Sequence, residues 1–191
     1  PFPTFDGGAI NVEEYGGLVL FNSSFSNNSA EYNGGAIYLA DGANASIGGS
    51  SFLGNHAGNK GGGLYGNSNI SVLIGDSTFA NNNASIGGGI RIDDVLTNTS
   101  LEIRNTTISG NIGGGVSIGE TNASAKILNS TLANNTGAAL HVESGYLSLQ
   151  NSILADSIGS ADATTGANAT IAADFSLIED PGSANIVNVT V

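Results

Sequence analysis

The sequence predicts an all-β protein whose chain winds into a single-stranded right-handed parallel β-helix, a solenoid of about six to seven coils. Two observations predict this fold. Two short motifs recur along the chain at nearly constant spacing, and the residues between them alternate between apolar and variable. A unit of this length with short strands cannot bury its inner face alone, so stacked units must form one continuous core.

The first motif is a glycine-rich stretch closed by an apolar residue, such as GGAI at residues 7–10 and 34–37. Successive copies lie 27, 27, 26, 26 and 24 residues apart. Glycine accepts positive φ and lets another backbone approach closely, so we expect these glycines at tight corners. The closing apolar residues are Ile10, Ile37, Leu64, Ile90, Val116 and Leu140.

The second motif is an apolar residue that follows a polar triplet, such as Phe25 in FSNN at residues 25–28. Three positions beyond it stands an Asn in the first five copies and Ser157 in the sixth. The residues five and seven positions before the apolar residue are apolar in every copy, whereas the residue between them varies freely. This period of two indicates a strand with one buried face. We predict an inward aromatic stack and an asparagine ladder at a corner. The apolar residues of this motif are Phe25, Phe52, Phe79, Ile108, Leu132 and Leu154.

The repeats divide the chain into two parts of the same domain. Residues 1–159 are predicted to form the β-helix coils. Residues 160–191 leave the register, and we expect a loop, a degenerate last coil and a terminal strand there. The loop is predicted over SADATTGANAT at residues 160–170, and the strand over IVNVTV at residues 186–191.

Composition excludes several classes of function. The net charge is −12 with only four Lys and Arg residues, so a nucleic-acid surface is not expected. The chain has no cysteine, hence no disulfide framework and no thiolate metal site. No apolar run approaches the roughly 20 residues of a membrane-spanning helix, so no transmembrane segment is expected. We expect neither a metal nor a cofactor.

Twelve Asn-x-Ser/Thr sequons make the chain a candidate for N-glycosylation. Glycans would cover the surface of a chain in which only 10% of all residues are charged. The alternative is that β-helix corners favour Asn and nearby strands favour Ser and Thr, so that sequons arise without selection. The candidate residues are Asn22, Asn27, Asn44, Asn69, Asn83, Asn98, Asn105, Asn122, Asn129, Asn134, Asn168 and Asn188.

Two stretches could carry chemistry on the outer surface. RIDD at residues 91–94 supplies Arg91, Asp93 and Asp94, and paired carboxylates could do acid–base work on a polysaccharide. Neighbouring coils do not repeat these acids, which favours a solvated turn instead. An outward stripe of Tyr38, Tyr65 and Arg91 could contact carbohydrate, although stacking between coils explains the stripe equally well.

The GGAI repeats, together with FSNN, FLGN and FANN, resemble the repeats of chlamydial polymorphic outer-membrane proteins. They are also similar to the wider group of pectin-lyase-like β-helix surface proteins. The resemblance covers about residues 7–157, and this sequence departs from the family in lacking cysteine. The resemblance implies a secreted passenger domain that acts as an adhesin or surface structure.

We therefore expect a secreted, non-enzymatic structural or adhesive protein, located extracellularly or at the cell surface. It is expected to be N-glycosylated and to stack end to end into a filament. Its partners would be other copies of itself, or a carbohydrate or protein on a cell surface. The alternative is a polysaccharide-active or carbohydrate-binding β-helix of the pectin-lyase-like kind.

Overall fold

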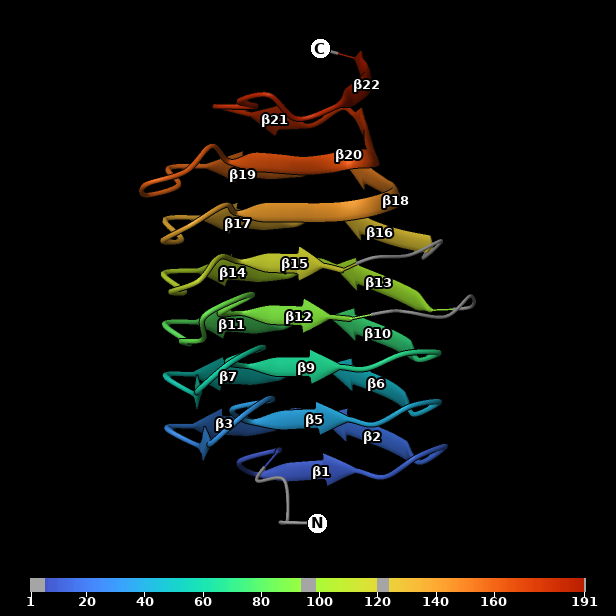
Figure 1. Ribbon diagram of the computed structural model, residues 1–191, viewed down its shortest axis with the longest axis vertical. Coiled ribbons are helices and arrows are strands. Elements are labelled where there is room, and N and C mark those ends of the chain that lie inside the picture. The colour runs from blue at the N-terminus through green and yellow to red at the C-terminus, as the bar shows by residue number, and fades with distance from the viewer. Residues whose placement is uncertain (1–5, 94–98, 120–123, 191) are drawn as a thin grey trace.

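The computed structural model describes residues 6–93, 99–119 and 124–190. The coils are layered along the long axis of the molecule, from the N-terminal end to the C-terminal end (Figure 1). Every strand pairing among the described residues is parallel. No helix in these ranges is long and apolar enough to span a bilayer. The predicted all-β fold, a parallel β-solenoid, is confirmed.

Each coil contributes strands to three faces. The first face follows the glycine-rich corners and contains β1 (Ile10–Val12), β5 (Ile37–Leu39), β9 (Leu64–Gly66), β12 (Ile90–Ile92), β15 (Val116–Ile118) and the first parts of β18 (Leu140–Gln150) and β20 (Ala163–Asp174). The second face contains β2 (Gly17–Phe21), β6 (Asn44–Gly48), β10 (Ser71–Gly75), β13 (Ser100–Arg104), β16 (Ser124–Leu128), the later parts of β18 and β20, and β22 (Ile186–Thr190).

The third face is a seven-stranded sheet, and a two-stranded sheet lies beside it. The third face contains β3 (Ser24–Ser26), β7 (Ser51–Leu53), β11 (Thr78–Ala80), β14 (Thr107–Ser109), β17 (Thr131–Ala133), β19 (Ile153–Ala155) and β21 (Leu177–Ile178). The small sheet pairs β4 (Ser29–Ala30) with β8 (His56–Ala57).

The core forms where the three faces point inward. Ile47, Ile74 and Ile103 are register partners on the second face and are buried, as the alternation predicts. On the third face Phe52 lies between two other phenylalanine rings, with centroid distances of 5.0 Å to Phe25 and 4.3 Å to Phe79. The predicted inward aromatic stack is therefore present. Burial of these apolar columns is the main favourable term for folding.

A buried asparagine ladder connects five coils at the corner after the third face. Each side-chain amide donates to the Oδ1 atom of the Asn one coil further on, at 2.9–3.0 Å. The backbone N–H of each donor residue reaches the same Oδ1 atom. Asn is thus the residue that satisfies buried polar backbone and continues the stack. The ladder comprises Asn28, Asn55, Asn82, Asn111 and Asn135.

A second polar ladder, which the sequence analysis did not identify, lies just before the third face. Each backbone N–H donates to the hydroxyl of the next coil at 3.1–3.4 Å. Each hydroxyl in turn donates to the carbonyl two residues before it. The ladder comprises Ser23, Ser50, Ser77, Thr106, Ser130, Ser152 and Ser176.

The glycine corners use the two glycines of each motif differently. Gly34 has a φ of +69°, a conformation that a side chain disfavours. Gly35 has no such φ, but a Cβ atom there would lie 2.2 Å from the carbonyl oxygen of Gly62 on the next coil. The pair therefore needs glycine for two separate reasons, a left-handed turn and close packing of successive backbones.

The chain after residue 160 differs from its prediction. The segment predicted as a loop over residues 160–170 instead forms, from Ala163 onward, the first part of β20. This strand stays in register, with Ala163 opposite Leu140 and Ile171 opposite Leu147, apart from one shift at which β20 carries an extra residue between Thr165 and Asn168. Alanine and glycine made the segment resemble a loop, but the preceding coil offers a strand edge that overrides weak β-propensity. The predicted terminal strand is present as β22.

Candidate functional site

The outer surface of the first face carries one column of side chains in strict register. Each residue of the column is the Cα partner of the next across successive parallel strands, one coil apart. The strands bring side chains from residues more than 150 positions apart in sequence onto one surface. The column, called the outward column below, contains Asn11, Tyr38, Tyr65, Arg91, Ser117, His141 and Thr164.

The two tyrosines of this column stack on each other. Their ring centroids are 5.3 Å apart and the rings are 14° from parallel. Tyr65 is 6% exposed, because Tyr38 covers one side of it and the register places Arg91 on the other. Burial, followed by the nearby charge of Asp93, raises the pKa of the Tyr65 hydroxyl, so that it stays protonated at neutral pH. Tyr65 therefore offers no open ring face on which a sugar could stack.

Asp93 is the centre of a charged cluster beside the tyrosines. Its carboxylate accepts hydrogen bonds from Lys60 Nζ at 2.6 Å, from the Arg91 guanidinium at 2.5 Å and from the Tyr65 hydroxyl at 3.1 Å. Burial raises the pKa of Asp93, but the hydrogen bonds and charges of Lys60 and Arg91 outweigh burial and hold that pKa below its usual value. The carboxylate is thus ionised and fully engaged at neutral pH, and Asp94 lies outside the described residues.

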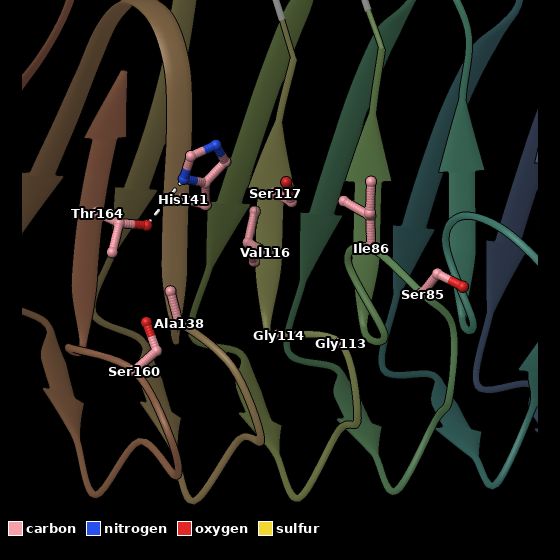
Figure 2. A pocket seen from close by; sticks show the side chains of 10 residues that line it. All are labelled: Ser85, Ile86, Gly113, Gly114, Val116, Ser117, Ala138, His141, Ser160 and Thr164. Carbon is pink, nitrogen blue, oxygen red and sulfur yellow. Dashed lines mark hydrogen bonds between the residues drawn. The ribbon is translucent and has the colours of Figure 1, made fainter. Parts of the chain in front are cut away.

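A groove of about 330 Å³ opens further along the outward column. Figure 2 shows its lining: Ser117, His141 and Thr164 form one end, and Gly113, Gly114 and Ala138 form the other. Ser85 and Ile86 flank it from the preceding coil, and Ser160 flanks it from the following one. Val116 completes the lining.

Hydrogen bonds fix the polar side chains at one end of the groove. Arg91 Nη1 donates to Ser117 Oγ at 2.6 Å, which connects the groove to the Asp93 cluster. His141 lies between two partners, with Nδ1 at 2.8 Å from Thr164 Oγ1 and Nε2 at 2.9 Å from Glu143 Oε2. The imidazole orientation is therefore set from both sides.

Metal binding finds no support in this arrangement. Within the described ranges, no three His, Cys, Asp or Glu side chains come together in a way that could hold an ion. The polar groups of the groove are hydroxyls, backbone amides and the single imidazole of His141, which are suited to hydrogen-bonding a ligand.

The sequon asparagines lie mostly on the surface. Eight of the nine whose side chains are described are exposed, and Asn83 is half-buried. Asn98 and Asn122 lie outside the described residues, and for Asn188 in β22 only the backbone is described. The exposed residues are Asn22, Asn27, Asn44, Asn69, Asn105, Asn129, Asn134 and Asn168.

Several of these asparagines also serve the fold. Asn22, Asn27 and Asn69 have φ values of 49°, 55° and 58°, in the left-handed region that Asn tolerates better than most residues. Asn129 Nδ2 donates to Asn105 Oδ1 on the neighbouring coil at 3.3 Å. These asparagines therefore have a structural role at the corners, which accounts for an Asn at these positions without glycosylation.

Sequence reasoning named the outward stripe of Tyr38, Tyr65 and Arg91, which is part of the outward column, but did not single out the groove. Thr164 was missed because it falls in the segment predicted as a loop, and Ser117 was given no binding role because a lone serine carries no signal. One signal was available in the sequence. The distance from the ladder Asn to the apolar residue closing the glycine motif is 9, 9, 8, 5 and 5 residues in successive coils, so a corner shortens abruptly after the third coil.

Comparison with known proteins gives one match. The family model described as the Chlamydia polymorphic membrane protein repeat matches residues 22–40, a span that contains FSNN and the second GGAI. No curated protein and no solved structure matches the chain. A repeat of a membrane-protein family, set in a parallel β-solenoid, indicates a surface-type repeat protein.

Proposed function

We propose that the chain is a secreted, non-enzymatic protein of the cell surface, with a structural or adhesive role. The observation that carries this proposal is the continuity of the interior. Apolar columns, an aromatic stack and two polar ladders pass from coil to coil, so each unit is bonded to the next. Such an interior makes a stiff rod with a long outer surface, which suits display at a cell boundary.

The absence of catalysis is part of this proposal, and it rests on the state of Asp93. A general acid must hold a proton near neutral pH, whereas the pKa of Asp93 is lowered. A general base must have a free lone pair toward substrate, whereas this carboxylate already accepts from Lys60, Arg91 and Tyr65. The polysaccharide-active alternative is tested with polymers of uronic acid. Cleavage that Asp93→Ala abolishes would replace our proposal with that enzyme.

N-glycosylation is the second part of the proposal. It is supported by the exposure of eight sequon asparagines and by a surface poor in charged groups, which glycans would keep soluble. The test is the intact mass of the chain purified from its native source. We expect a mass above 19.0 kDa that returns to this value after enzymatic deglycosylation. A native mass equal to that of the bare chain would end this part of the proposal.

End-to-end association of copies is the third part. Among the described residues, β2 and β3 each pair with one strand, as do β21 and β22 at the other end. An unpaired strand edge is a template for a further parallel strand. Negative-stain micrographs of native material should therefore show rods longer than one chain. Single particles at every concentration would contradict end-to-end association while leaving the surface role in place.

A further inference from the structure

The groove of Figure 2 arises from a change in corner length. In the first three coils, the corner between the ladder Asn and the first face holds three or four more residues than in the next two. The longer corner of the third coil contains Ser85 and Ile86, which line the same hollow as Gly113 and Gly114 of the shortened corner. The step between a long and a short corner creates the hollow.

Glycine keeps the floor of this hollow open. Gly113 and Gly114 have φ values of +93° and +99°, which side chains rarely adopt. A Cβ atom on Gly113 would lie 2.1 Å from the carbonyl oxygen of Ala84. The corner can therefore be this short only with glycine. Beside it, His141 and Thr164 of the outward column are half-buried, and Ser117 is 3% exposed.

The lining of the groove is rich in hydroxyl groups and includes one imidazole, that of His141. Ser85, Ser117, Ser160 and Thr164 contribute hydroxyls, and no Lys, Arg, Asp or Glu is among the lining residues. The nearest guanidinium, that of Arg91, is held by its ion pair with Asp93 and by its hydrogen bond to Ser117. An anionic ligand would also face the net charge of −12 of the whole chain.

The hydrogen bonds already present determine which hydroxyls can donate to a ligand and which can accept from it. Ser117 Oγ accepts from Arg91, so the Ser117 proton is available to donate. Thr164 Oγ1 and His141 Nδ1 share one hydrogen bond at 2.8 Å. Whichever of the two atoms donates, Thr164 Oγ1 keeps at least one lone pair for a ligand donor. One end of the groove thus presents a donor and an acceptor side by side.

An apolar wall faces these polar groups. Ile86, which is 40% exposed, and Ala138 line the same hollow. A ligand that fits must be neutral, must both donate and accept through several hydroxyls, and must present C–H surface on another side. A pyranose ring has these properties, and 330 Å³ lies at the lower end of the size range of small-molecule sites.

We propose that this groove binds one neutral hexopyranose unit, with Ser117 and Thr164 as the groups that hydrogen-bond its hydroxyls. The site lies further along the outward column than Tyr38 and Tyr65, and it needs no catalysis. It gives the rod a carbohydrate contact on its side.

The test uses the 19.0 kDa chain labelled with ¹⁵N and three probes, the methyl pyranosides of glucose, galactose and mannose, at millimolar concentration. We expect saturable shifts of the backbone amides of Gly114, Ser117 and Thr164 with at least one probe. The amide of Gly75, on the second face, should not move. Absence of saturable shifts with all three probes would overturn the proposal.

Substitutions then identify the residues that contact the sugar. Thr164→Val and Ser117→Ala should each weaken the binding about three- to tenfold, the effect of losing one neutral hydrogen bond. Ala138→Leu keeps every hydroxyl and fills the hollow, so it should abolish the shifts. Because it leaves the hydrogen bond between Arg91 and Ser117 in place, it tests the site even if Ser117→Ala disturbs Arg91. Thr107→Val, on the exposed side of β14, is the matched control. Equal weakening by this control, or full binding in Ala138→Leu, would contradict the proposed site.

Discussion

The asparagine ladder allows the most exacting test of how the coils are held together, through the substitution Asn82→Ala. The side chain of Asn82 is fully buried and makes four hydrogen bonds. It accepts from the backbone N and the side-chain Nδ2 of Asn55, both at 2.9 Å. It donates to the carbonyl of Phe52 and to Oδ1 of Asn111, both at 3.0 Å.

Removing this side chain leaves donors of Asn55 and the carbonyl of Phe52 without these partners in a dry interior. At a net value of about 1 kcal/mol for each hydrogen bond, and more where a buried group stays unsatisfied, the loss is about 4–6 kcal/mol. This is a large part of the 5–15 kcal/mol that typically separates folded from unfolded states. Urea unfolding followed by far-UV circular dichroism should show the midpoint fall by about 2 M.

The adjacent residue supplies the matched control. Asn81 is exposed and has a φ of 56°, and Gly54 and Gly110 occupy the equivalent position on the coils before and after it. Asn81→Gly keeps the left-handed turn and should change the free energy of unfolding by less than about 0.5 kcal/mol. A loss below about 1 kcal/mol for Asn82→Ala, or equal losses for the two variants, would refute the role given to the buried ladder.

Three further predictions concern the corner, the core and the charged cluster. Gly35→Ala should destabilise the folded protein by about 3 kcal/mol, because its Cβ would meet a carbonyl oxygen at 2.2 Å. Gly75→Ala, with open space around the new methyl group, should leave stability nearly unchanged. Similar thermal midpoints for the two variants would contradict the close-packing argument. Phe52→Ala should lower the free energy of unfolding, measured in urea, by about 3–5 kcal/mol. Leu53 is 40% exposed, so Leu53→Ala should lower it by only about 0.5 kcal/mol. A small loss for the Phe variant would show that the aromatic stack is dispensable. The pKa of Asp93 is lowered on folding, so its ionised form stabilises the protein above the unfolded pKa near 4, and this contribution is lost as pH falls through the folded pKa. The stability advantage of wild type over Asp93→Asn, measured by urea unfolding across pH, should therefore be constant near neutrality and shrink below about pH 4, and an advantage that grows on acidification would contradict the ion pairs.

The repeating interior could be predicted from the sequence because its signal is summed over six copies. Ile47, Ile74 and Ile103 stand at one position of successive repeats, and the structure pairs them in register. The Asn column was likewise visible. The hydroxyl ladder through Ser50 and Ser77 was not, because serine is ordinarily exposed and its burial depends on the carbonyl that it reaches.

The outer surface was harder to predict because its contacts join single residues rather than columns. Lys60 and Asp93 lie 33 residues apart in the chain, and no repeated pattern marks their ion pair. The groove depends on which corner shortens, and on residue Thr164 in a segment whose composition suggests a loop. Periodicity therefore specifies the inside of a solenoid, whereas the departures from periodicity create its surface sites.

The proposed surface role requires the chain to lie outside the cell, and immunogold electron microscopy measures that location. Antibodies raised against the folded chain are applied to intact and to sectioned cells of the native source. We predict gold on the surface of intact cells or on material attached to it, at a density close to that seen in sections. Label confined to the interior of sectioned cells, with none on intact cells, would contradict the surface role.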